Sequence, residues 1–282
     1  MNQQAHFSHY VPLLLFTAML LIAAGIVMAV EAAHLFLPGA WDLEMALLAM
    51  AFVLAAVGGA ISFLHLGRKE RAVRAALGLA HSWLSREAIL AALFAGAALA
   101  ALLFRISDLA AIWFTVFVVV ASVSGLLTAI AIGKLYDLEA QAGWRGWAQA
   151  LTAPVSALLL AAALFIVAPG SAEYAPVFYV VWLADVVLLG FRDSGYRRNV
   201  REGAMFSFPK LSRAAKFAYN FRKLFSIAAL VAVVSSTALI AVAAIAVAIC
   251  LDRFCLYAAS VQSTPSSEIT ALKAERMRQA LG

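Results

Sequence analysis

Three side chains that can exchange protons or hydrogen-bond an oxygen stand where apolar runs of the chain meet polar ones: His65, Glu87 and Tyr136. Histidine titrates near neutral pH, and a partly buried glutamate can exchange protons in the same range. A tyrosine hydroxyl can hydrogen-bond a carbonyl oxygen. Together these groups suit a quinone head group, which needs hydrogen bonds at two oxygens and gains or loses protons as electrons move.

Each of these residues also has an ordinary structural interpretation. A histidine at the end of a membrane helix is a common interfacial anchor. Glu87 could simply lie in the first turn of its helix, where a carboxylate interacts favourably with the helix dipole. The functional interpretation therefore depends on whether the three side chains share one face of the membrane.

The composition indicates an all-α, polytopic transmembrane helical bundle. Of the 282 residues, 65% are hydrophobic and only 13% are charged, which is untypical of a soluble domain. A crossing needs about 20 apolar residues, and helices satisfy their own backbone hydrogen bonds in lipid. The first apolar run is too long for a cleavable signal peptide, and the stretch before it contains no Lys or Arg.

About eight helices are expected, although seven remain possible. The last apolar run, 224–251, is long for one crossing and short for two. Ser235-Ser236-Thr237 near its middle marks either a turn between two helices, which would span from near Leu211 to about Tyr257, or three hydroxyls inside one helix. The membrane domain is predicted over 1–260 and a polar tail over 261–282. The other helices are expected at 11–36, 44–66, 86–104, 110–135, 147–168 and 174–191.

Basic residues predict the orientation of the bundle. Most of them fall in 67–86, 134–146 and 192–223, whereas the loops on the opposite side contain only Arg105. The positive-inside rule therefore places the N-terminus and these segments in the cytoplasm, as expected for a multi-pass protein of the bacterial cytoplasmic (inner) membrane. The net charge of +6 has the same origin, so no nucleic-acid partner is expected. The basic tail favours a cytoplasmic C-terminus, hence eight crossings.

With this topology, His65, Glu87 and Tyr136 lie at one membrane depth on the cytoplasmic side. Asp185, in YVVWLADVVLLGF, is expected about one and a half turns from the cytoplasmic end of its helix. An intramembrane carboxylate is a candidate for a proton path, and a helix–helix hydrogen bond is the equal alternative.

Other features are expected to serve packing. Gly58, Gly59 and Gly96 should permit close approach of neighbouring helices. Cys250 and Cys255 are expected to be packing residues, and no metal site is predicted.

Two other functions stay open from the residues alone. A haem b anchor needs two facing histidines, but His34 and His65 are expected at opposite membrane faces, about 30 Å apart. A His9–His65 pair is geometrically conceivable. A small-molecule transporter usually has inverted repeats and broken helices at the midplane. Here no strong repeat is evident, and the midplane is nearly featureless apart from Ser122, Ser124, Thr128 and Thr152-Ala153-Pro154.

Several motifs resemble the DMSO reductase anchor subunit family. FLHLGRKERAVRAAL contains the family's HLG-type motif at the end of the second helix, followed by Arg71-Ala72. SWLSREAI contains the Leu-Ser-x-Glu motif that opens the third helix. HYVPLLLFT, LDRFCLYA and a tyrosine closing the fourth helix also resemble the family.

The resemblance implies a non-catalytic integral subunit of eight helices without haem. It would anchor a molybdopterin catalytic subunit and an iron–sulfur subunit in membrane lipid, and exchange electrons with a quinone, either menaquinone or ubiquinone. In the family, the positions of His65 and Glu87 belong to the quinol site, to which we add Tyr136 and Arg71. The predicted partner-docking residues are Arg68, Lys69, Arg74 and Arg86.

One feature departs from the exported DMSO reductases, whose catalytic subunits are expected outside the cytoplasm. The charge bias here places the site on the inner face. A related branch serves sulfite dehydrogenases that work in the cytoplasm, and the basic segment 192–223 would suit docking of such a partner. The sequence therefore favours the sulfite-oxidising branch over a DMSO reductase anchor.

Overall fold

The structure is a computed structural model that describes residues 10–37, 39, 43–65, 82–107, 111–137, 146–201 and 213–258, and residues 273, 276 and 277 of the tail. Within these ranges, eight helices are long and apolar enough to cross a membrane. The prediction of an all-α polytopic bundle is confirmed, and the count favours eight crossings over seven.

The helices follow the expected apolar runs closely, and the first five begin and end within three residues of the predicted positions. A short 3₁₀ helix, η1, precedes the sixth crossing. The elements are α2 (Val11–Phe36), α3 (Glu44–His65), α5 (Trp83–Ser107), α6 (Ala111–Leu135), α7 (Trp147–Phe165), η1 (Ala172–Tyr174), α8 (Ala175–Arg201), α9 (Arg213–Val234) and α10 (Ala238–Ala258).

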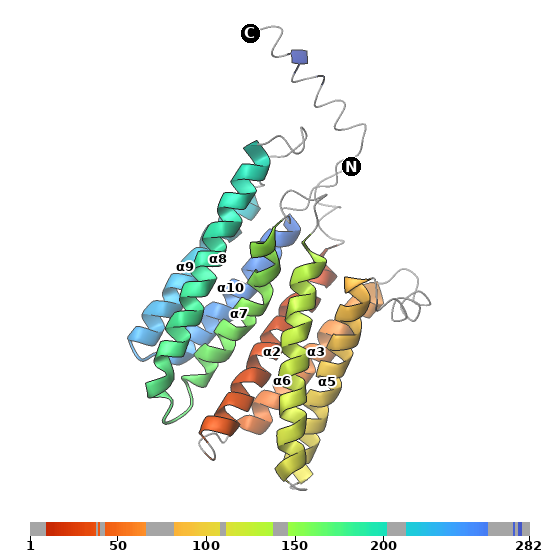
Figure 1. Ribbon diagram of the computed structural model, residues 1–282, viewed down its shortest axis with the longest axis vertical. Helices are drawn as coiled ribbons and strands as arrows, with labels where there is room; N and C mark the ends of the chain where they lie inside the picture. Colours follow the sequence, from red (N-terminus) through yellow and green to blue (C-terminus); the bar gives the residue numbers. More distant parts are fainter. Residues whose placement is uncertain are drawn as a thin grey trace.

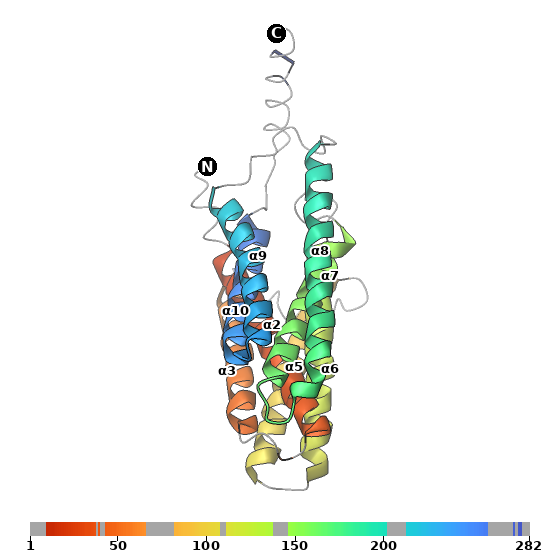
Figure 2. The ribbon, with the colours of Figure 1, turned by 90° about the vertical axis from the view of Figure 1, so that its left-hand side faces the viewer.

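The helices form two groups that lie side by side (Figure 1). One group contains α2, α3, α5 and α6, and the other contains α7 to α10. α2 contacts α3, α6, α7 and α10, so it joins the two groups. α9 packs mainly on α10 and only sparsely on α8. α8 and α9 are visibly separated in the second view (Figure 2).

A left-handed residue separates α9 from α10. Ser236 has φ = 59°. The backbone N–H of Ser236 donates to the carbonyl of Val233, and that of Thr237 donates to the carbonyl of Ala232. This is the hydrogen-bond pattern of a Schellman motif, which ends a helix. Of the two interpretations of the hydroxyl triplet, the turn is therefore the one confirmed.

The sixth crossing continues past the end predicted for it. α8 runs to Arg201 rather than 191 because the polar residues after the apolar run keep their helical conformation. Arg192, which the sequence placed in the basic segment beyond the sixth crossing, lies instead within α8 with its side chain 11% exposed, and Arg222 is buried in α9. Asp185 is accordingly much farther than one and a half turns from the end of its helix.

Two glycines mark the closest approach between helices, and neither was predicted to do so. A Cβ added at Gly133 of α6 would overlap the carbonyl oxygen of Ala150 in α7. One added at Gly25 of α2 would lie 2.8 Å from the oxygen of Ala157. Gly58 does contact α2, but Gly59 and Gly96 face open space, so the packing role expected for these two was wrong.

Gly133→Ala should destabilise the bundle by about 1–3 kcal/mol, because the new methyl group meets backbone rather than a flexible side chain. Gly96→Ala is the matched control, since nothing lies within 4 Å of its added Cβ. Thermal unfolding of the two variants in detergent would measure the difference. Equal melting temperatures would contradict the close contact between α6 and α7.

Candidate functional site

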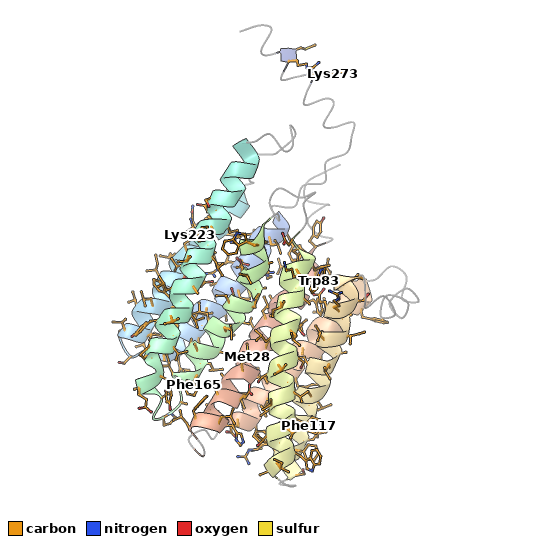
Figure 3. The ribbon with its side chains drawn as sticks, viewed as in Figure 1. Met28, Trp83, Phe117, Phe165, Lys223 and Lys273 are labelled. Carbon is orange, nitrogen blue, oxygen red and sulfur yellow. The ribbon has the colours of Figure 1, made fainter. Side chains whose placement is uncertain are left out.

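Three tyrosines that are distant in sequence meet at one end of the bundle. The Tyr257 hydroxyl, near the end of α10, donates to the Tyr136 hydroxyl over 2.6 Å. The Tyr257 ring also stacks on Tyr10, just before α2, with ring centroids 5.6 Å apart. We call Tyr10, Tyr136 and Tyr257 the tyrosine cluster. Trp83 and Lys223 lie toward this same end, and Phe117 and Phe165 toward the other (Figure 3).

Glu87 lies in α5 beside the tyrosine cluster. The Ser82 hydroxyl accepts a hydrogen bond from the Ser85 backbone at the start of α5, and no acidic residue lies in the first turn. The interpretation of Glu87 as a first-turn carboxylate is therefore wrong. Glu87 is only 2% exposed, and within the described part of the chain its Oε1 has no hydrogen-bond partner.

An unpartnered buried carboxyl oxygen is uncommon, because burial of a polar atom without a hydrogen bond costs free energy. Such an atom often marks a place where a bound molecule completes the hydrogen bonding. Glu87 interacts electrostatically with Tyr136 and Arg253, so three polar groups from α5, α10 and the end of α6 converge.

Tyr136 follows the last residue of α6 and is 6% exposed. Burial raises the pKa of its hydroxyl well above the ordinary value, and the nearby Tyr257 and Glu87 act in the same direction. The hydroxyl therefore remains neutral at physiological pH and can take part in hydrogen bonds as donor and acceptor.

Arg253 is the site residue that sequence reasoning missed. It lies four residues before Tyr257, which places both side chains on one face of α10. Its Nη2 donates to Asp252 Oδ2 over 2.6 Å, while Nε and Nη1 have no partner among the described residues. The signal for it was available, because an Asp-Arg pair inside an otherwise apolar run is unusual in a membrane helix.

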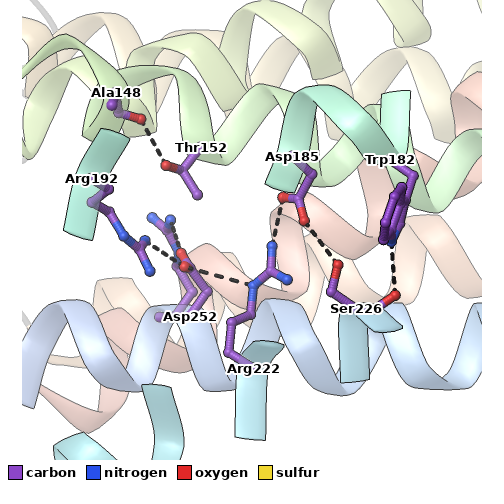
Figure 4. A network of polar contacts seen from close by, with 9 residues as sticks. Ala148, Thr152, Trp182, Asp185, Arg192, Arg222, Ser226 and Asp252 are labelled. Carbon is purple, nitrogen blue, oxygen red and sulfur yellow. Dashed lines mark hydrogen bonds and ion pairs between the residues drawn. The ribbon is translucent and has the colours of Figure 1, made fainter. Parts of the chain in front are cut away.

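Asp252 contacts Arg192 of α8 and Arg222 of α9 (Figure 4), and so connects its neighbour Arg253 to these helices. Its Oδ1 accepts a hydrogen bond from Arg192 Nη1 over 2.5 Å and lies 3.9 Å from Arg222 Nε. One carboxylate on α10 therefore faces guanidinium groups from α8, α9 and α10. The side chains of these four residues are at most 11% exposed.

Asp185 extends this network along the interface between α8 and α9. Arg222 Nη2 donates to Asp185 Oδ1 over 2.6 Å, and the Ser226 hydroxyl donates to Oδ2 over 3.3 Å. Trp182 Nε1 donates to the carbonyl of Ser226. Asp185 thus forms hydrogen bonds between helices, which was the second of the two interpretations of this residue. Its role in a proton path stays a prediction.

The opposite end of the bundle contains a separate polar group. His34 Nε2 lies 2.9 Å from the Thr115 hydroxyl, and Arg105 Nε donates to Glu44 Oε2 over 3.2 Å. Because α2 and α3 are consecutive antiparallel helices, His34 and His65 end them at opposite faces. These two histidines therefore cannot ligate one haem.

The remaining predicted residues are only partly within the described structure. His65 is the last residue of α3, but its side chain lies outside the described residues. Arg86 is half-buried with its guanidinium carbon 4.5 Å from the Trp83 ring centroid. Among the described residues there is no group of three metal-ligating side chains. Arg68, Lys69, Arg71 and Arg74 lie outside the described residues.

The polar atoms of this end fit a head group that carries hydrogen-bonding oxygens. Glu87 offers a carboxyl oxygen, and Arg253 offers two nitrogens, Nε and Nη1, with no partner among the residues that the structure describes. A quinone or quinol could use both, since its two oxygens accept hydrogen bonds when oxidised and also donate them when reduced.

One comparison with known proteins identifies the chain's relatives. The sequence profile of the family described as DMSO reductase anchor subunit (DmsC) matches residues 5–263. This range includes all eight membrane helices, the tyrosine cluster, Glu87 and Arg253. No curated protein matches the chain.

Asp252→Asn should lower stability more than Asp185→Asn, because Asp252 faces three guanidinium groups and Asp185 faces one. Breaking a buried ion pair costs about 3–5 kcal/mol, against less than about 1 kcal/mol for an exposed one. Asp193→Asn is the matched control, since its contact with Lys223 is longer and partly exposed. Melting temperatures in detergent would rank the variants, and equal losses for Asp252→Asn and Asp193→Asn would contradict this account.

Proposed function

Because the chain belongs to the DMSO reductase anchor subunit (DmsC) family, we propose that it passes electrons between a membrane quinone and the iron–sulfur subunit of a molybdoenzyme complex. The family implies a membrane anchor whose partners are a catalytic subunit and an iron–sulfur subunit. The exchange of electrons with a quinone is more specific than membrane anchoring, and this part of the proposal rests on the chemistry of the site as well as on the family.

The observation that carries the proposal is the Glu87 carboxyl group. It is buried in a membrane-spanning helix, its Oε1 has no partner in the described structure, and it lies beside Tyr136 at a helix end. A structural carboxylate in such a place would be paired, as Asp185 and Asp252 are. An unpaired one is suited to a molecule that brings its own hydroxyl or carbonyl group.

Each residue of the proposed site has its own role in this exchange of electrons and protons. Oxidation of a quinol releases two electrons and two protons, and reduction of a quinone takes up the same number. His65 would hydrogen-bond one head-group oxygen, and Glu87 would accept or supply a proton. Tyr136, fixed by its hydrogen bond with Tyr257, would orient the head group. Arg71 completes the proposed quinone-binding set.

The electrons would leave or enter through the partner that docks on the same face. Arg68, Lys69, Arg74 and Arg86 are the proposed docking residues. In this proposal the N-terminus and the site face the cytoplasm from the bacterial inner membrane, as the basic residues predict. A partner on that face favours the sulfite-oxidising branch of the family.

Glu87→Gln and His65→Ala should each abolish quinone-linked turnover of the intact complex and leave dye-linked turnover unchanged, because the dye bypasses the membrane site. Glu31→Gln is the matched control, since it removes a carboxylate from α2 near the opposite end. The two activities are measured on the same membrane preparation. Equal loss of both activities in an assembled complex would refute the proposed site.

Mild purification from the native membrane should recover this chain with two partners, and the complex should contain molybdenum and iron. Metal analysis and mass spectrometry of the purified material would test this. A catalytic partner without an export signal would support the sulfite-oxidising branch, and one with an export signal would support a DMSO reductase. A chain that purifies alone and free of metal would overturn the electron-transfer role and favour transport.

A further inference from the structure

The buried network of α8, α9 and α10 contains one more positive charge than negative. Arg192, Arg222 and Arg253 carry three positive charges, and Asp185 and Asp252 carry two negative ones. Arginine keeps its proton in proteins, so it cannot relieve this excess by titrating. A buried charge without compensation costs several kcal/mol, so the position of the excess charge matters.

The contacts locate the excess at Arg253. Arg222 lies between two carboxylates, at 2.6 Å from Asp185 and 3.9 Å from Asp252. Arg253 is bonded through Nη2 alone, and its one carboxylate partner is shared with both other arginines. Nε and Nη1 have no hydrogen-bond partner within the described structure in either Arg253 or Arg222, but Arg222 has a second carboxylate in Asp185. Arg192 also contacts Asp252 alone, but its side chain is 11% exposed, against 1% for Arg253. Arg253 is therefore the fully buried cation of the network that has a single, shared carboxylate.

Arg253 is also the network residue that faces the tyrosine cluster. It interacts electrostatically with Glu87, Tyr136 and Tyr257. The network thus has one end at Asp185, between α8 and α9, and the other at the site proposed for the quinone. Outside the network, Glu87 is a carboxyl group with which Arg253 interacts electrostatically, so it can take part in balancing the excess charge.

We propose that Arg253 binds the quinone head group, donating from its unpartnered N–H groups to one head-group oxygen and compensating the negative charge that develops there. This inference rests on the proposed quinone site and adds to it the residue that stabilises charge. Asp252 is a positioning residue in this scheme, because its Oδ2 accepts the hydrogen bond from Nη2 and so holds one side of the Arg253 guanidinium group.

The proton balance supports this pairing. When a head-group hydroxyl transfers its proton to the Glu87 carboxylate, the O–H bond of the head group breaks and an O–H bond forms on Glu87. The negative charge moves from Glu87 to the head-group oxygen, and Arg253 faces both. The net charge of the buried group does not change, so the transfer avoids the cost of creating a new buried charge. When electrons arrive from the partner's iron–sulfur clusters to reduce a quinone, the same proton moves in reverse, from Glu87 to the head-group oxygen, and a second proton must reach the other oxygen.

Binding of a quinol analogue tests the inference without relying on turnover. The fluorescent 2-heptyl-4-hydroxyquinoline N-oxide is titrated into membranes that contain the assembled complex, and its quenching gives a Kd per complex. Arg253→Gln should weaken binding about 10- to 100-fold, because a hydrogen bond to a charged group is lost. Arg253→Lys should recover part of the affinity, since it keeps the charge but not the planar set of donors.

Arg222→Lys is the matched control, because it changes an equally buried arginine of the same network that does not face Glu87. It should reduce the amount of assembled complex and leave the Kd unchanged. If the complex with Arg253→Gln does not assemble, the Kd is measured with Arg253→Lys instead. An unchanged Kd in an assembled Arg253 variant would overturn the inference.

Glu87→Gln, measured in the same way, separates this inference from the function beneath it. Weakened binding in Glu87→Gln with normal binding in the Arg253 variants would refute only the role of Arg253. Normal binding in both would refute the quinone site itself. Weakened binding in both, with Arg222→Lys normal, would support both proposals.

Discussion

Asp252 accepts ion-pair contacts from guanidinium groups on three helices, and the association of α8, α9 and α10 depends on them. α8 and α9 pack only sparsely on each other, so the polar contacts of Asp185 with Arg222 and of Trp182 with Ser226 replace much of the usual side-chain packing. In a medium as apolar as the bilayer, packing gains little from the hydrophobic effect. The buried charges are stable only when they are paired, so their ion pairs hold these helices together.

The same constraint links the stability of the bundle to its proposed chemistry. Arg253 belongs both to the Asp252 network and to the group around Glu87 and the tyrosine cluster. Loss of the Asp252 carboxylate would therefore remove the hydrogen bond that holds Arg253 as well as the contacts between the helices. The first helix group contributes Glu87 and Tyr136, and α10 contributes Arg253 and Tyr257, so the site lies where the two groups meet.

The crossings and the shared end of His65, Glu87 and Tyr136 could be predicted from sequence, because apolar length and helix direction are local properties. The contacts that these side chains make with other helices could not be predicted. Arg192 and Arg222 were counted with the basic segment 192–223, and nothing local indicates that Asp252 contacts both of them. The close contact at Gly133 was missed for the same reason, since it depends on which helix lies opposite.

The network also constrains how the chain enters the membrane during synthesis. α8 and α9 reach the bilayer with Arg192 and Arg222 before α10 has been made, and of the two carboxylates of the network only Asp185 is then present. A buried arginine in a membrane helix is costly, by up to about 2.5–3.5 kcal/mol at the helix centre. The last helix therefore completes the charge balance of the two before it. A chain truncated before α10 would leave an uncompensated cation between its helices, which would expose it to removal by membrane proteases.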